Sequence, residues 1–249
     1  MKLFFGQIFP EIIIDADEQQ HIAKVLRMRE GEEIFLTDGN GNLAKGTLIF
    51  EGKKITLNVS EVKENLPDFS PKLHIAIAPT KNIDRIEFFL EKAVEMGISE
   101  VSLILTEQTE RKNISIDKLR KQAIGASKQS LRSHFPKIND LQKFSEFIKT
   151  LDSENTFVAH CNENLERINL NQLRPFDSAQ DDNSNDVSLR PSKTSLETTF
   201  LIGPEGDFSD REIQLLAEKG IKAVSLGNQR LRTETAGIFV AAWNYDKMF

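Results

Sequence analysis

Three short segments near the end of the chain combine glycines with a few polar side chains. The first runs from Gly203 to Gly206, the second ends at Gly227, and the third runs from Leu231 to Gly237. A glycine lets a ligand approach the backbone with no Cβ in the way. Because the segments offer glycines and aliphatic side chains rather than rows of charges, they predict a site that reads its ligand largely through backbone groups.

The elements around these segments are those of an α/β ligand site. The apolar run from Thr199 to Ile202 predicts a buried strand. Ser209 and Glu212 have the spacing of a capping box at the start of a helix that ends at Gly220. A second strand is expected over residues 221–226, and a last helix begins near residue 234. Open α/β sheets bind ligands where strands end, so the three segments are expected to meet.

A lone Gly-x-x-Gly often only punctuates an α/β connection, and as a motif it is weak. Here three segments occur together, and they closely resemble the terminal signature of the RsmE family, which methylates N3 of a uridine in small-subunit ribosomal RNA. The matching residues are Gly203-Pro204-Glu205-Gly206-Asp207-Phe208-Ser209, Leu226-Gly227 and Arg230-Leu231-Arg232-Thr233-Glu234-Thr235-Ala236. The chain departs from the pattern at Asp207, where the family usually has Gly, and at Asn228-Gln229, which are placed differently before Arg230.

The resemblance extends along almost the whole chain. The stretch from His21 to Arg27 resembles the family's H-x-x-x-V-L-R, and residues 81–97 resemble its K-x-x-R-x-E-x-x-x-x-K-A-x-E-L-G. Glu110-Arg111 matches its S-E-R, and residues 126–136 resemble A-x-E-Q-S-x-R…P. Lys128 stands where the family has Glu, so any role of that carboxylate does not transfer to this chain.

The resemblance implies a two-domain enzyme. Residues 1–69 would form a small PUA-like β-barrel that binds RNA, and residues 72–249 a SPOUT α/β methyltransferase domain with a C-terminal trefoil knot. The substrate would be a uridine of 16S ribosomal RNA in the small ribosomal subunit, and the enzyme would work as a homodimer. The cofactor would be S-adenosylmethionine, bound by Leu201, Ile202, Gly203, Pro204, Glu205, Gly206, Leu226, Gly227, Leu231 and Thr235.

Methyl transfer to a uridine nitrogen sets two requirements. The donor is already activated as a sulfonium, so the enzyme must align it with the nitrogen and make that nitrogen nucleophilic. The uracil N3–H is acidic only well above neutral pH, so a base removes its proton or a cation stabilises the anion. Arg232 is the candidate for stabilising the developing charge. Glu234 is a candidate base, or it orients Arg232; the alternative is that it only caps the last helix.

Five basic residues are candidates for RNA contact, because cations at loop or helix ends suit phosphates and base edges. They are Arg27, Lys81, Arg85, Arg111 and Arg132. Each arginine has the ordinary alternative of an ion pair, which for Arg27 would involve Glu30 or Glu33. The net charge of −6 argues mildly against nucleic-acid binding. About half of that charge falls in residues 175–197, so the rest of the chain is nearer neutral.

The composition of the chain gives further expectations about disorder, cysteine chemistry, metal sites and localisation. Residues 175–197 are rich in Ser, Asp and Asn and predict a disordered surface insert, because they cannot bury enough apolar surface to offset their ordering entropy. The single cysteine, Cys161, excludes an intrachain disulfide and is expected to be a buried, small apolar residue. The scattered histidines predict no metal site. A cytoplasmic protein is expected, since neither a signal peptide nor a membrane-spanning run is visible.

Two other classes of function are weighed against the enzyme. The same two domains could bind ribosomal RNA without activity if the altered loop at Asp207 held no cofactor. A nucleotide-dependent Rossmann enzyme is disfavoured, because no Gly-x-Gly-x-x-Gly follows a strand.

The C-terminal helix from Glu234 to Phe249 is apolar around nearly its whole circumference. One face can cover the sheet, and the other predicts a two-fold interface; the alternative is a helix buried on both sides within one subunit.

Overall fold

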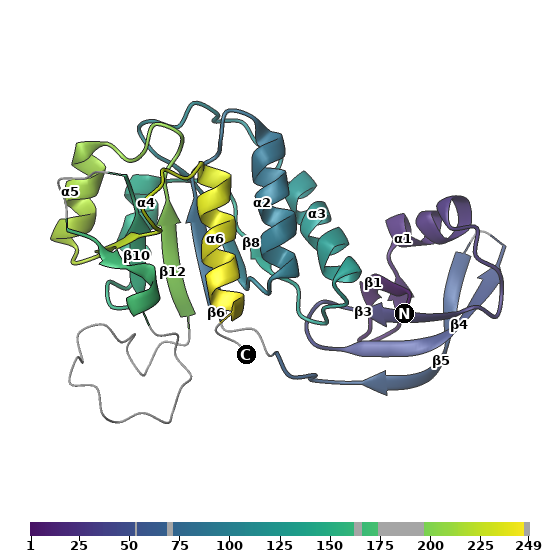
Figure 1. Ribbon diagram of the computed structural model, residues 1–249. Helices are drawn as coiled ribbons and strands as arrows, with labels where there is room; N and C mark the ends of the chain where they lie inside the picture. Colours follow the sequence, from purple (N-terminus) through teal and green to yellow (C-terminus); the bar gives the residue numbers. More distant parts are fainter. Residues whose placement is uncertain (53, 69–71, 162–165, 174–196, 247–249) are drawn as a thin grey trace, which may run out of the picture. The chain divides into compact units, whose positions relative to one another are not determined.

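The computed structural model describes residues 1–52, 54–68, 72–161, 166–173 and 197–246 of the 249-residue chain. The chain divides into two units (Figure 1). The first contains Met1–Phe69 and Ile124–Phe135, and the second contains Ser70–Ala123 and Pro136–Phe249. The predicted insert at residues 175–197 lies outside the described residues, apart from Glu197, where a strand begins.

The first unit is built on a five-stranded sheet with the strand order β2-β1-β3-β4-β5. Alternate side chains of β4 are buried over most of its length, and the aliphatic core includes Ile34, Leu36 and Leu48. The pairs are antiparallel except for β1 with β3. The elements are β1 (Leu3–Gln7), β2 (Ile13–Ile14), α1 (Ala16–Gln20), a π-helical turn (His21–Val25), β3 (Glu33–Thr37), β4 (Leu43–Glu51) and β5 (Lys54–Lys63).

Lys128, which departs from the family pattern, has a structural role in this unit. Its ammonium donates to the carboxylate of Glu18, which lies on α1 and is buried. A carboxylate removed from water needs a paired charge, and removing one partner of such a pair is strongly destabilising. The lysine therefore neutralises a buried charge at this position, where the family pattern has a glutamate of its own.

The second unit is an α/β domain whose strands all pair in parallel, in the order β11-β13-β10-β12-β6-β7-β8, with β9 also pairing with β7. The strands are β6 (Lys72–Ile77), β7 (Glu100–Leu105), β8 (Lys137–Ile138), β9 (Gln142–Lys143), β10 (Thr156–Ala159), β11 (Ile168–Asn169), β12 (Glu197–Ile202) and β13 (Lys222–Ser225). The helices are α2 (Ile83–Glu95), α4 (Phe144–Thr150), a 3-10 turn (Leu170–Gln172), α5 (Asp210–Glu218), α6 (Thr233–Asp246) and α3 (Ile116–Gln129), whose residues from Ile124 on belong to the first unit.

Three neighbouring strands bring the glycine-rich segments together. β10 lies between β12 and β13, and Ala159 at its end is in register with Ile202 on one side and Val224 on the other. Because the pairs are parallel, the three strands end at one edge of the sheet. The loops that follow them therefore begin side by side, where an open α/β sheet binds its ligand.

The helices α2 and α6 pack against each other, and α6 also contacts β6 and β12 (Figure 1). The side chains that α2 buries, Ile86, Phe89, Leu90, Ala93 and Val94, recur at helical spacing along the sequence. At the helix contact Gly237 faces Phe89: a Cβ built on this glycine would stand 2.6 Å from the phenylalanine ring. The missing side chain thus allows the close approach of the two helices that cover the sheet.

The Gly237→Ala substitution is expected to lower the free energy of unfolding by about 1–3 kcal/mol, the usual cost of overpacking. Gly125→Ala, in α3, is the matched control, because a Cβ there meets no described atom within 4 Å outside its own helix. That control is expected to gain up to about 1 kcal/mol from helix propensity. Urea unfolding followed by circular dichroism compares the two variants, and a Gly237→Ala protein as stable as the control would contradict this packing.

Candidate functional site

A cavity of about 250 Å³ opens where β10 and β12 end. Six of its lining residues belong to the sets predicted from the sequence: Ile202, Gly203, Pro204, Glu205, Leu231 and Arg232. Six others were not among those candidates: Ala159, Cys161, Asp207, Arg230, Thr233 and Ala236. The structure therefore brings the first and third glycine-rich segments to one cavity and adds the end of β10.

Hydrogen bonds hold the two main loops of this cavity together. The hydroxyl of Thr233 donates to the Gly203 carbonyl at 3.0 Å, and this bond is buried. The guanidinium of Arg230 donates to the Glu205 carbonyl at 3.3 Å. The loop after β12 and the segment before α6 are thus joined at two points, as expected of a binding site that is largely formed before its ligand arrives.

Asp207 occupies a backbone conformation that glycine favours. Its φ is 66°, in the left-handed region that Asp tolerates better than most side chains. One carboxylate oxygen accepts the Phe208 N–H at 2.8 Å, and the other accepts the Cys161 N–H at 2.7 Å. The departure from the family's Gly therefore keeps a compatible turn and links the loop after β10 to the loop after β12.

Cys161 is exposed and lines the cavity, so the prediction that it is a buried apolar residue is wrong. Partial burial raises the pKa of its thiol, and the nearby Asp207 carboxylate acts in the same direction. The thiol is therefore protonated at neutral pH. The sequence shows only that Cys161 follows a predicted strand, and it does not show that this strand ends at the cavity.

The two catalytic candidates have different surroundings. Arg232 is exposed, lines the cavity and has no ion pair with any described residue. Glu234 is only 8% exposed and lies in the first turn of α6. Its Oε1 stands 3.7 Å from the Arg85 Nε, and its Oε2 has no hydrogen-bond partner among the described residues. Arg232 is thus placed to meet a ligand, whereas Glu234 lies behind the cavity wall.

The other predicted cofactor residues do not line the described cavity. Leu201 is fully buried in β12, and Leu226 is half-buried after β13. Gly227 has a φ of 119°, which L side chains rarely adopt, so its role is to shape the turn. Gly206 and Thr235 are exposed beside lining residues. Contact of these five residues with a bound cofactor stays a prediction.

Three of the basic candidates lie in the second unit and have partners there. The Lys81 ammonium pairs with Glu110 at 3.1 Å, and the Lys81 carbonyl accepts a hydrogen bond from the Arg111 Nε at 2.9 Å. Arg85 is paired with Glu234 and lies 3.7 Å from Glu205. The ion pairs reduce the charge that Lys81 and Arg85 present to RNA.

Two basic candidates lie in the first unit. Arg27 is exposed with a φ of 49°, and no ion pair joins it to Glu30 or Glu33. Arg132 is half-buried; burial lowers its pKa, and the carboxylate of Asp68 opposes that shift. Arg27 is therefore the more accessible of the two for an external phosphate.

Comparison with known proteins decides the family. Residues 68–244 match the family described as RNA methyltransferase domain, and residues 14–59 match the RNA methyltransferase PUA domain. The Ribosomal RNA small subunit methyltransferase E of Bacillus subtilis (strain 168) is 27% identical over 240 residues, which cover 92% of this chain and 88% of that protein. The chain belongs to the RsmE family of RNA methyltransferases. This confirms the family recognised from the sequence.

Solved structures agree with this RsmE-family fold. A structure named probable rRNA-methyltransferase from Porphyromonas gingivalis is 32% identical with a TM-score of 0.81, over 100% of this chain and 98% of that one. The Ribosomal RNA small subunit methyltransferase E of Neisseria gonorrhoeae bound to S-adenosyl methionine is 24% identical with a TM-score of 0.74, over 97% and 95%. The PUA-like unit followed by a parallel α/β unit is confirmed, while the trefoil knot stays a prediction.

Two further observations concern the described ranges alone. Within them, no helix combines the length and apolarity needed to cross a bilayer. In the same ranges, no three His, Cys, Asp or Glu side chains are grouped in a way that suits a metal ion.

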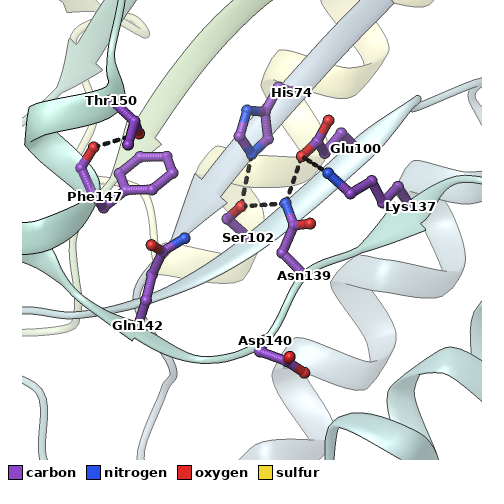
Figure 2. Close-up of a pocket in the computed structure, with 9 residues that line it drawn as sticks. All are labelled: His74, Glu100, Ser102, Lys137, Asn139, Asp140, Gln142, Phe147 and Thr150. Carbon is purple, nitrogen blue, oxygen red and sulfur yellow. Dashed lines mark hydrogen bonds and ion pairs between the residues drawn. The ribbon is translucent and has the colours of Figure 1, made fainter.

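A second cavity, of about 350 Å³, lies against the amino-terminal halves of β6 and β7, away from all the predicted site residues (Figure 2). His74 and Ser102 are joined there, with 2.8 Å between Nε2 and Oγ. The Asn139 amide donates to the Ser102 Oγ at 2.8 Å and also to Glu100, whose carboxylate pairs with Lys137 at 3.2 Å. Because Ser102 accepts from the amide, its own proton is free to go to His74.

This arrangement requires a neutral His74 ring. Burial lowers the pKa of His74 to about 4, against the opposing effect of the Glu100 carboxylate. A neutral ring accepts the Ser102 proton at Nε2 and keeps its own proton on Nδ1, 3.5 Å from the Thr199 hydroxyl. The network satisfies its buried members internally, which identifies it as a structural feature of the sheet.

Acid is therefore expected to destabilise the protein through His74. The unfolded chain binds this proton near pH 6.5 and the native chain only near pH 4, so the stabilisation present above pH 6.5 is lost as the pH falls. Between pH 7 and pH 5 the loss is about 2 kcal/mol. Urea unfolding of wild type and His74→Gln at both pH values tests this. An equal pH dependence in the two proteins would contradict it.

Proposed function

We propose that this protein is an S-adenosylmethionine-dependent methyltransferase that methylates N3 of a uridine in 16S ribosomal RNA of the small ribosomal subunit. The observation that carries the proposal is the cavity between residues 203–207 and 230–236 in a chain of the RsmE family. The names of the Bacillus subtilis and Neisseria gonorrhoeae relatives support small-subunit ribosomal RNA as the substrate, and the latter structure holds the cofactor. The choice of uridine N3 rests on the resemblance of the sequence to the RsmE family.

The lining of the cavity suits such a cofactor. Ile202, Leu231 and Ala236 supply apolar surface, and the glycine-rich loop supplies backbone groups for the polar edges of a ligand. When bound, S-adenosylmethionine supplies a methyl group already activated as a sulfonium. The chain's own task is to fix the position of the acceptor nitrogen and to exclude water from it.

Arg232 has the leading catalytic role in this proposal. As the uridine N3 loses its proton, negative charge spreads over the uracil ring, and a guanidinium at the cavity wall would stabilise it until methyl transfer neutralises the ring. The N3–methyl bond forms while the sulfur–methyl bond breaks, and the N3 proton passes to solvent or to a base. Glu234 lies behind the wall, so we assign it to positioning rather than to proton removal.

The proposal extends to the partners of the enzyme. The PUA-like unit binds RNA with Arg27 as an accessible contact, and the enzyme acts in the cytoplasm, where ribosomal subunits are assembled.

Two copies associate through exposed aromatic residues of α2 and α6, namely Phe88, Phe239 and Tyr245. Sedimentation equilibrium at micromolar concentration tests the assembly: a dimer mass is expected, and a monomer that still methylates RNA would contradict it.

The proposed activity is tested with the purified protein and radiolabelled S-adenosylmethionine. Small ribosomal subunits from a strain lacking the enzyme are expected to gain label in the 16S RNA, while subunits from a complemented strain gain little. Isothermal titration with the cofactor separates this function from the RNA-binding alternative. No heat of binding together with tight binding of RNA would identify an inactive RNA-binding protein and overturn the proposal.

A further inference from the structure

Arg85 lies between two carboxylates that belong to different loops of the cavity. Its Nη1 stands 3.7 Å from the Glu205 Oε1, and its Nε stands 3.7 Å from the Glu234 Oε1. Glu205 is on the loop after β12, whereas Glu234 begins α6. The arginine itself lies near the start of α2, and its side chain is 35% exposed. One guanidinium therefore joins three segments that are distant in the sequence.

Other contacts converge on Glu205. The Lys81 N–H donates to the Glu205 Oε1 at 3.1 Å, so the segment that leads into α2 also binds this loop. Arg230 binds the carbonyl of Glu205 from the opposite segment. A lysine in place of Arg85 could not reproduce the arrangement, because an ammonium is a point charge without the two separate edges of a guanidinium.

The burial of Glu234 makes the arginine necessary. This carboxylate is only 8% exposed, and its second oxygen has no partner among the described residues. Without Arg85 it would be a buried charge lacking its ion pair, a state that costs far more than the pair itself contributes. The start of α6 would then shift toward water, and it would take with it the neighbouring cavity residues Thr233 and Ala236.

We propose that Arg85 is a positioning residue of the cofactor cavity: it holds Glu205 and Glu234 so that the loops at 203–207 and 230–236 keep the shape that binds S-adenosylmethionine. This role replaces the RNA contact predicted for Arg85, and it rests on the proposed function. The arginine acts from behind the cavity wall and is not among the lining residues.

The test measures cofactor affinity and RNA affinity separately. Arg85→Gln and Arg85→Lys are both expected to raise the dissociation constant for S-adenosylmethionine at least tenfold by calorimetry. Arg211→Gln is the control, because the side chain of that arginine is 81% exposed and its ion pair with Glu107 is long, at 3.9 Å. It is expected to bind like wild type. If Arg85 contacted RNA, its replacement would instead lower the slope of log K against log salt for RNA binding by about one unit. The affinity for the cofactor would then be unaffected.

A double-mutant cycle tests the link to Glu234. In an Arg85→Gln background, Glu234→Gln is expected to recover part of the lost cofactor affinity, because it removes the buried charge that Arg85 no longer neutralises. Circular dichroism confirms that each variant is folded. Cofactor affinity of Arg85→Gln within twofold of wild type would overturn the inference. If wild type itself bound no cofactor, the proposed function would fail instead.

Discussion

Replacing Arg232 with alanine is expected to reduce the rate of methyl transfer by about 10²- to 10³-fold, the usual cost of removing one group that stabilises transition-state charge. The reason is its position: it is exposed, it lines the cavity, and no ion pair with a described residue neutralises it. The measurement is kcat at saturating cofactor and RNA. Because the guanidinium acts mainly as charge develops, cofactor affinity is expected to change much less than kcat.

Two controls make this result specific. Arg211→Ala removes an exposed arginine elsewhere in the same unit and is expected to keep wild-type kcat. Arg232→Lys keeps the charge and is expected to retain more activity than Arg232→Ala. A kcat for Arg232→Ala within threefold of wild type, in a protein that still binds both ligands, would remove Arg232 from the catalytic step.

The second large effect is expected at the glycine-rich loop. A Cβ at Gly203 would stand 3.1 Å from the Phe208 ring and 3.2 Å from the Asp207 carboxylate. Phe208 is buried and packs against Phe144, with 5.8 Å between the ring centroids, so it cannot easily move away. Gly203→Val therefore displaces the loop, and overpacking of about 1–3 kcal/mol corresponds to roughly a 10- to 100-fold weaker binding of the cofactor.

Ala217→Val is the matched control for this substitution. It introduces the same side chain at an exposed position of α5, away from the cavity. Calorimetry with S-adenosylmethionine is expected to separate the two variants clearly while their thermal unfolding shows both to be folded. Wild-type affinity in Gly203→Val would show that the cofactor does not depend on this loop.

Local features of the fold were predictable from the sequence because they depend on neighbours along the chain. The five buried residues of α2 recur every three or four positions, which is the spacing of one face of a helix. Ser209 and Glu212 form the predicted capping box, with each side chain bonded to the other's backbone N–H. Gly97 and Gly220 have positive φ at the ends of their helices, as a glycine stop requires.

Features that depend on the order of strands in the sheet could not be predicted from the sequence. Nothing near Cys161 in the sequence reveals that β10 lies between β12 and β13, so its place in the cavity was missed. The ion pairs of Arg85 could not be foreseen, because its two carboxylate partners are more than a hundred residues away along the chain. Composition and spacing cannot specify such non-local pairs; only the parallel sheet order brings them together.

The most direct test of the central claim is the identity of the methylated nucleoside. The 16S RNA of wild type, of a deletion strain and of that strain complemented with the wild-type or Arg232→Ala gene is digested and analysed by mass spectrometry against authentic 3-methyluridine. We predict that 3-methyluridine is lost on deletion, restored by the wild-type gene and not restored by Arg232→Ala. Undiminished 3-methyluridine in the deletion strain, or restoration of a different methylated nucleoside, would contradict the account.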